Sequence, residues 1–297
     1  MKRTIVSILI IGLLLFGCGN DTNPASSSPG DGPFITIWKT DNSGPSNDYQ
    51  ITIPTAGSGY NYNVDWGDGS ISEGVTWGNI THTYSAIGVY TVKITGDFPR
   101  IAFFANGSPT DKDKIISIES WGDIEWHSME EAFAYCSNLT LNTNTIPDFS
   151  KLTSLSAMFL SASSLQGGDI GGWDVSNVTD MSRMFYGATC FNGDISNWDV
   201  SNVLNMGRMF QEAHDFNQDI GNWDVSNVTQ MHCMFETTEW FSANLESWDV
   251  SNVTVMWRMF YGALSMDGDL RGWDVSKVTN HDDFQHASNI IEPLWSD

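Results

Sequence analysis

Carboxylates recur at a fixed spacing in the second half of this 297-residue chain. One series directly follows a tryptophan: Asp174, Asp199, Asp224, Asp249 and Asp274. A second series precedes the same tryptophans by four residues: Asp169, Asp194, Asp219, Asn244 and Asp269. If the units stack as parallel strands about 4.8 Å apart, the second series lines one face, which suits a divalent cation such as calcium or another ligand. We favour the alternative that the first series caps turns and the second forms a solvated face.

Two other aspartates, Asp65 and Asp68, lie in the segment VDWGDGS at 64–70. They could ligate calcium, but aspartates in such a turn more often accept hydrogen bonds from its backbone, and we prefer this interpretation. No cofactor other than calcium is suggested. The chain has neither a G-x-S-x-G nucleophile motif nor a glycine-rich phosphate loop after a strand. Because the repeats spread carboxylates evenly instead of gathering them in a pocket, we expect a protein that is not an enzyme.

Cys18 is the residue most suited to covalent modification. Lys2 and Arg3 precede an apolar run at 5–16 that is short for a membrane span and typical of a signal peptide. The segment LLFGC at 14–18 resembles a bacterial lipobox, which implies removal of residues 1–17 and lipidation of Cys18. The Pro-, Gly- and Ser-rich residues 18–33 then form a flexible tether. We expect a secreted protein that is attached to the outer membrane only by its lipid and faces the cell surface.

The overall charge limits the partners. Lys and Arg total 13 against 36 Asp and Glu, so the formal net charge is −23. Nucleic acids and anionic lipid headgroups both require a basic surface, so neither is an expected partner. Hydrophobic residues make up 41% of the chain, which favours a folded body over a disordered acidic polymer. Of the other cysteines, Cys136, Cys190 and Cys233 have no zinc spacing and are expected as buried free thiols.

Residues 34–104 alternate large and polar side chains in short segments, at 34–38, 49–53, 60–66 and 88–95. Gly-, Ser- and Asn-rich turns separate these segments, a pattern that predicts antiparallel strands. The WGDG turn, followed by His82, Tyr84 and the segment GVYTV at 88–92, resembles the PKD domain. That resemblance implies an immunoglobulin-like β-sandwich that acts as a spacer or a binding module, followed by a connector at 105–120.

The region 121–297 is repetitive. Tryptophans recur every 25 residues, at Trp173, Trp198, Trp223, Trp248 and Trp273, and each opens a block close to WDVSNVTDMSRMF. Degenerate copies at 121–133 and 147–159 bring the total to about seven units. This period predicts an α+β solenoid of leucine-rich-repeat type, in which stacked units share one core. The last unit departs from the pattern and has a charged, polar end, which suits a terminal cap.

Each unit contains an amphipathic stretch. Val178, Met181, Met184 and Phe185 fall on one face of a helix, so a short helix is expected there, with a short parallel strand between Phe191 and Ile195. Stacking should place the tryptophans in a buried ladder with Met184, Phe185, Met209, Phe210, Met234, Phe235, Met259 and Phe260.

The blocks resemble the W-D-V-S-N-V-x-x-M-x-x-M-F repeats of BspA-family leucine-rich-repeat surface lipoproteins. Residues 132–139 (AFAYCSNL) also match an element of that family. The resemblance implies adhesion or recognition of a protein at the cell surface. Two alternatives stay open: tryptophans that stack on glycans, and an envelope spacer without a ligand. An exposed tryptophan ladder would favour glycans.

The residues that differ between units mark the expected specificity surface. They occupy two registers: Tyr186, Gln211, Glu236 and Tyr261 in one, and Arg183, Arg208, Cys233 and Arg258 in the other.

Overall fold

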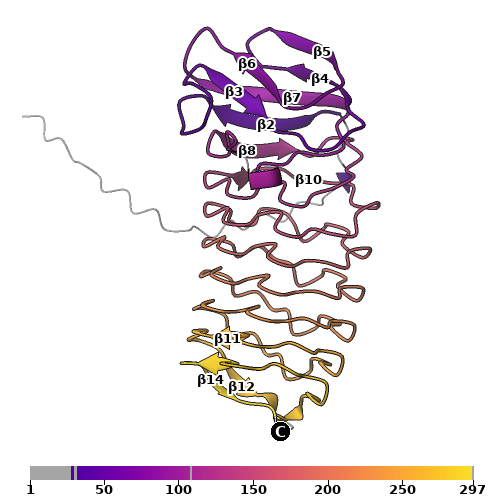
Figure 1. The fold of residues 1–297 in the computed structure, drawn as a ribbon, viewed down its shortest axis with the longest axis vertical. Helices are drawn as coiled ribbons and strands as arrows, with labels where there is room; N and C mark the ends of the chain where they lie inside the picture. Colours follow the sequence, from indigo (N-terminus) through magenta and orange to yellow (C-terminus); the bar gives the residue numbers. More distant parts are fainter. Residues whose placement is uncertain (1–27, 30–31, 108, 296–297) are drawn as a thin grey trace, which may run out of the picture.

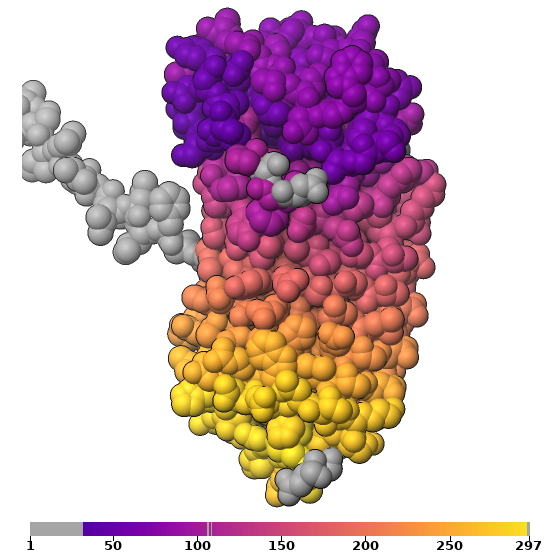
Figure 2. All heavy atoms as spheres, viewed as in Figure 1, coloured from indigo at the N-terminus to yellow at the C-terminus, as the bar shows by residue number. Residues whose placement is uncertain are grey.

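The structure is a computed structural model that describes residues 28–29, 32–107 and 109–295. The signal peptide, Cys18 and most of the expected tether lie outside the described residues. The described chain forms one column, with strands packed at one end and a series of stacked coils leading to the C-terminus (Figure 1). Figure 2 shows the same column filled by side chains along its length.

A six-stranded mixed sheet forms the end of the column that is nearer the N-terminus. Its strands follow the order β5-β4-β7-β2-β8-β9. Their bounds are β2 Phe34–Lys39, β4 Asn61–Asp65, β5 Ile71–Val75, β7 Val89–Asp97, β8 Ile115–Ser120 and β9 Thr140–Leu141. β2 pairs antiparallel with β7, and β4 pairs antiparallel with both β5 and β7. β3 (Gln50–Ile53) and β6 (Ile80–Thr83) form a separate antiparallel pair.

The alternation in the sequence explains these strands. In β2 the side chains of Phe34, Thr36 and Trp38 are buried, whereas the residues between them are half-buried. The expected strands at 34–38, 49–53, 60–66 and 88–95 correspond to β2, β3, β4 and β7. β5 and β8 were not predicted. Only Val75 of β5 is buried, so this strand has no alternation of apolar and polar residues that would have predicted it.

The sheet continues into the coils without a break. The stretch 105–120, expected as a connector, contains a 3-10 helix, η1 (Ala105–Gly107), and β8, which pairs antiparallel with β2. β8 then pairs in parallel with β9, which belongs to the first coils. Phe34 of β2 stacks on Trp121 at 5.9 Å, and Trp121 meets Trp173 edge-on at 5.5 Å. One hydrophobic core therefore runs through both regions.

The coils are joined by parallel pairing at equivalent positions. Single parallel bridges link Ser154, Asp180, Asn205, Gln230, Val255 and Asn280 in succession. Around each bridge, alternate backbone N–H groups donate to the next coil: Met181 to Asn205 (3.0 Å), Arg183 to Gly207 (3.0 Å) and Phe185 to Met209 (3.0 Å). Each coil thus adds one row to a continuous parallel ladder, which a single unit could not form.

Short paired segments occur near both ends of the coils. They are β1 Ser28–Pro29 with β10 Thr145–Ile146, β11 Phe260–Tyr261 with β13 Gln285–His286, and β12 Asp267–Asp269 with β14 Asn289–Ile291. A 3-10 helix, η2 (Leu270–Gly272), follows β12. At the C-terminal end, the Trp295 ring lies parallel to His281 at 4.1 Å and meets Phe284 edge-on at 4.9 Å.

The predicted helix is wrong, and the predicted parallel strand forms only near the ends of the coils, where β9 and β12 occupy its position. No α-helix occurs in the described ranges, and the stretch around Met181 and Phe185 forms the inter-coil ladder. Arg183 adopts a left-handed conformation (φ 56°), which interrupts any helical run. The segment 191–195, expected as a strand, is irregular. In these stretches turns alternate with extended residues, and this arrangement places the same apolar residues inward as a helix would. The apolar spacing alone therefore cannot distinguish the two structures.

Candidate functional site

The tryptophan ladder faces the interior. The five repeat tryptophans are between 3 and 5% exposed. The Nε1–H of Trp223 donates to the carbonyl of Ile195 in the preceding coil (3.1 Å), and Trp198, Trp248 and Trp273 make the equivalent bond. These indoles therefore join coil to coil and present no face on which a sugar could stack.

The expected methionine and phenylalanine positions surround that ladder. Met184, Phe185, Met209, Phe210, Met234, Phe235, Met259 and Phe260 are all fully buried. Phenylalanines of successive coils, from Phe133 to Phe260, stack with ring centroids 5.5 to 5.9 Å apart. The interior of the coils is thus uniform, so any site that distinguishes one coil from another must lie outside it.

The aspartates that follow the tryptophans form turns. Asp199 Oδ1 accepts hydrogen bonds from the backbone N–H (3.1 Å) and the hydroxyl (2.6 Å) of Ser201. Asp174, Asp224, Asp249 and Asp274 each accept the N–H of the serine two residues on. The bonds from Ser201 hold the pKa of Asp199 below its ordinary value. These carboxylates are engaged within their own coils.

Most members of the second carboxylate series also lie in turns. Asp194 accepts the N–H and hydroxyl of Ser196, Asp219 accepts the N–H of Gly221, and Asp269 pairs with Arg271. Asp169 differs, since one of its oxygens is buried without a partner. No group of three or more His, Cys, Asp or Glu among the described residues is arranged to hold a metal ion.

An asparagine ladder explains another repeated residue of the coils. The side-chain amide of Asn202 donates to the carbonyl of Ser176 in the preceding coil (2.8 Å). Asn177, Asn227 and Asn252 each make the equivalent bond to the coil that precedes their own. The repeated D-V-S-N-V sequence thus contributes a turn cap, a buried valine and an inter-coil bond. The signal available in the sequence was the recurrence of this asparagine in four successive repeats, at 177, 202, 227 and 252.

The variable registers lie beside the parallel ladder and form a connected polar network. Glu236, which is largely buried, accepts hydrogen bonds from Gln211 (2.9 Å) and Arg258 (3.0 Å). Arg208 donates to Gln211 (3.0 Å), and its Nε is buried without a partner. Cys233, Gln211 and Glu236 are all buried, so the expectation that they lie on the specificity surface is wrong. Burial raises the pKa of the Cys233 thiol, and the nearby Glu236 adds to this effect.

Aromatic rings accompany these arginines. The Arg208 guanidinium lies 5.4 Å from the centroid of Trp257, which stacks on His232 at 5.3 Å. Arg258 lies 4.5 Å from the Tyr261 centroid, and Tyr261 stacks on His286 at 5.2 Å. Burial lowers the pKa of His232, and nearby Arg208 lowers it further. Arg183, one coil toward the N-terminus, is exposed and has no ion pair among the described residues. We call the strip formed by Arg183, Arg208, Trp257, Arg258 and Tyr261 the variable face.

The WGDG segment forms a tight turn. Asp65 Oδ1 accepts the N–H of Gly67 (3.0 Å) and Asp68 Oδ1 accepts the N–H of Ser70 (3.0 Å). His82 Nε2 lies 2.9 Å from Asp68 Oδ2, and its ring stacks on Trp66 at 4.8 Å. Burial alone would raise the pKa of Asp68, but hydrogen bonds from Ser70 and His82 outweigh it and lower the pKa to about 2. These contacts match the turn interpretation of both aspartates.

Two buried charges in the sheet region were not predicted. Lys114 and Asp111 are both fully buried. Lys114 Nζ donates to the carbonyls of Ser46 (3.1 Å), Asn47 (2.8 Å) and Gln50 (2.9 Å). Neither residue stands in a recognisable motif, because their partners lie about 60 to 70 residues away in sequence, so no local signal could have identified them.

The structure also describes the state of three cysteines. Cys136 and Cys233 are free and buried, whereas Cys190 is disulfide-bonded, which corrects the expectation of a free thiol at that position. In the part of the chain that the structure describes, no helix has the length and apolar character needed to cross a bilayer.

The chain matches one protein family. The family is described as "Mycoplasma protein of unknown function, DUF285", and its model matches residues 127–237 and again 197–295. No curated protein and no solved structure matches the chain. Two overlapping matches to one model indicate internal repetition, in agreement with the 25-residue spacing. Because the matches cover more than half of the 297 residues, the chain belongs to the DUF285 family.

Proposed function

We propose that this protein is a lipid-anchored surface protein that recognises a protein partner through the variable face. The observation that carries the proposal is the contrast between the two sides of each coil. Interior positions repeat almost unchanged, whereas the residues beside the parallel ladder vary between coils. They include Arg183, which is exposed, and Arg208, Trp257 and Tyr261, which are half-buried. Arginine and large aromatic residues are also the types most enriched where proteins bind one another.

In this proposal the coils are a solenoid of leucine-rich-repeat type, similar to BspA-family repeats, and the sheet region is a PKD-like β-sandwich. The solenoid is supported by the inter-coil bridges and by the shared interior of stacked rings. The PKD-like assignment is supported by the WGDG turn and its contact with His82. A rigid stack suits recognition, because it presents side chains on a surface that does not need to be ordered on binding.

The buried ladder weighs against the first alternative, glycan binding by the repeat tryptophans. A binding experiment distinguishes recognition of a protein from the second alternative, a spacer without a ligand. Surface plasmon resonance would compare the full chain with Arg183→Glu and Tyr261→Ala variants over immobilised secreted and cell-surface proteins. Lys277→Glu, the same charge change in a turn away from the variable face, is the control. Selective loss by the first two variants supports recognition; no binding to any protein favours the spacer.

The anchor is tested separately. Protease treatment of intact cells should cleave the wild-type protein, and Cys18→Ala should release it from the membrane. Mass spectrometry of the N-terminal peptide should find a thioether-linked lipid on Cys18. A sulfur atom cannot carry a thioether and a disulfide together, so a disulfide at Cys18 would contradict lipidation. Protection of the wild-type chain until the envelope is broken would place it inside the cell envelope.

A further inference from the structure

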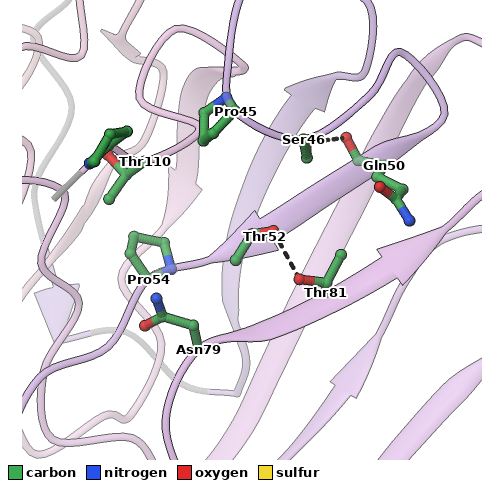
Figure 3. Close-up of a pocket in the computed structure, with 9 residues that line it drawn as sticks. Pro45, Ser46, Gln50, Thr52, Pro54, Asn79, Thr81 and Thr110 are labelled. Carbon is green, nitrogen blue, oxygen red and sulfur yellow. Dashed lines mark hydrogen bonds between the residues drawn. The ribbon is translucent and has the colours of Figure 1, made fainter.

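A polar cleft lies in the sheet region, away from the variable face. It has a volume of about 260 Å³ and lies between β3, β6, the loop before β3 and the segment 109–110. Figure 3 shows Thr52 and Thr81 on its floor, with Pro45, Pro54 and Thr110 around it. All nine lining residues are uncharged: they are prolines, hydroxyl residues and side-chain amides. The size suits a small ligand or one ring of a longer chain.

The two buried charges fix one wall of this cleft. Asp111 accepts hydrogen bonds from the hydroxyl (2.7 Å) and N–H (3.2 Å) of Ser46 and from the N–H of Thr52 (2.7 Å). Lys114 donates to the Ser46 hydroxyl (2.7 Å) and to the carbonyl of Gln50 (2.9 Å). Ser46, Gln50 and Thr52 all line the cleft. Burying two charges is costly, and here it results in a wall whose geometry is set before any ligand arrives.

The free hydrogen-bonding groups indicate the ligand. The hydroxyls of Thr52 and Thr81 lie 2.8 Å apart and each can still bond to a third oxygen. Asn79 uses its side-chain oxygen to accept the N–H of Thr55 (2.9 Å), which leaves its amide N–H groups as donors. Donors and acceptors in alternation, with no charged side chain, match a ligand that carries several hydroxyl groups and no charge.

An exposed aromatic residue adjoins the cleft in sequence. Trp77, two residues before Asn79, is 71% exposed. An exposed indole offers a flat apolar ring with one polar N–H, a combination that suits contact with a ligand that is partly apolar and partly polar. The apolar C–H face of a pyranose ring stacks on such a surface, while its hydroxyls meet polar groups. We propose that this cleft binds a neutral pyranose and that Trp77, two residues from Asn79 in sequence, supplies a stacking surface for the sugar, so the sheet region has a binding role separate from that of the variable face.

Saturation-transfer NMR on the full chain tests this site. The probes are methyl glucoside, methyl galactoside, methyl mannoside and N-acetylglucosamine, with glucuronate as the charged comparison. At least one neutral sugar should receive magnetisation and glucuronate should not. The double variant Thr52→Val, Thr81→Val keeps the side-chain shapes but removes both hydroxyls, and it should weaken binding about tenfold or more. Trp77→Ala should weaken it by a similar factor.

Thr95→Val is the matched control, because Thr95 is an exposed threonine of β7 that does not line the cleft. It should bind as the wild-type chain does. The proposal is overturned if no neutral sugar binds, if glucuronate binds equally well, or if the threonine and tryptophan variants bind like Thr95→Val.

Discussion

The sheet region and the coils share one core but are stabilised in different ways. In the sheet region each important contact occurs once: Lys114 with its carbonyls, His82 with Asp68, and the Tyr84 hydroxyl with the Trp66 carbonyl (3.1 Å). In the coils the same few contacts recur at every level. A contact that occurs once has no substitute when it is lost, whereas a coil retains a neighbour on each side. Damage should therefore be global in the first region and local in the second.

Removing a repeated contact from the middle of the coils is the strongest challenge to this contrast. Trp223→Ala deletes a buried indole and its bond to Ile195, which should cost about 3–5 kcal/mol of unfolding free energy. Hydrogen exchange should rise in the coils around 198–248 and stay low in β2 and β7. Equal loss of protection in β2 and β7 would show that the two regions unfold together. Trp240→Ala, which removes an indole that is 61% exposed, is the control and should change stability by less than about 0.5 kcal/mol.

The corresponding challenge in the sheet region is Lys114→Met. It removes the ammonium that donates to three carbonyls and leaves Asp111 without the nearby positive charge, which should cost about 3 kcal/mol in urea unfolding. Lys112→Met removes a partly exposed lysine whose partner is Asp113, and it should have little effect. Similar stabilities for the two variants would show that the buried ammonium is not important to the fold.

Backbone geometry in the WGDG turn gives a smaller effect. Gly67 has φ 78°, and a Cβ there would lie 2.4 Å from the Thr91 carbonyl oxygen, so Gly67→Ala should cost about 2 kcal/mol or more. Gly69 has a similar φ of 92° but nothing within 4 Å of its Cβ position, so Gly69→Ala should cost only about 1 kcal/mol. Thermal unfolding of both variants separates the steric clash from the conformational strain. Equal melting temperatures would rule out the clash.

The smallest expected effect is a dependence on pH. Asp68 has a pKa lowered to about 2 in the folded chain from an ordinary value of 3.8. Its contribution is therefore present above about pH 4 and is lost as the pH falls toward 2. The difference in unfolding free energy between the wild-type chain and Asp68→Asn should shrink over that range. A difference that stays constant with pH would mean that the Asp68 carboxylate is not stabilised by Ser70 and His82.

The repeats determine how much the sequence could predict. The 25-residue period locates the coils, and the spacing of Trp223 and Phe210 identifies interior residues without knowledge of secondary structure. It could not distinguish a helix from a ladder, because the turn at Arg183 places the same side chains inward. The cleft formed by Thr52 and Thr81 was beyond prediction, since Asp111 and Lys114 act on it from distant segments. Long-range, single contacts leave no local pattern.

The coil-to-coil hydrogen bonds have a mechanical consequence. In Figure 1 the coils succeed one another along the long axis of the column, so the bonds from Met181 to Asn205 and their equivalents join levels along that axis. A tensile load between the sheet region and the C-terminal end would open these rows one level at a time instead of shearing them all at once. Each released coil of 25 residues would lengthen the chain by up to about 80–90 Å. The column would then yield in steps and extend under force before the sheet region is loaded to failure.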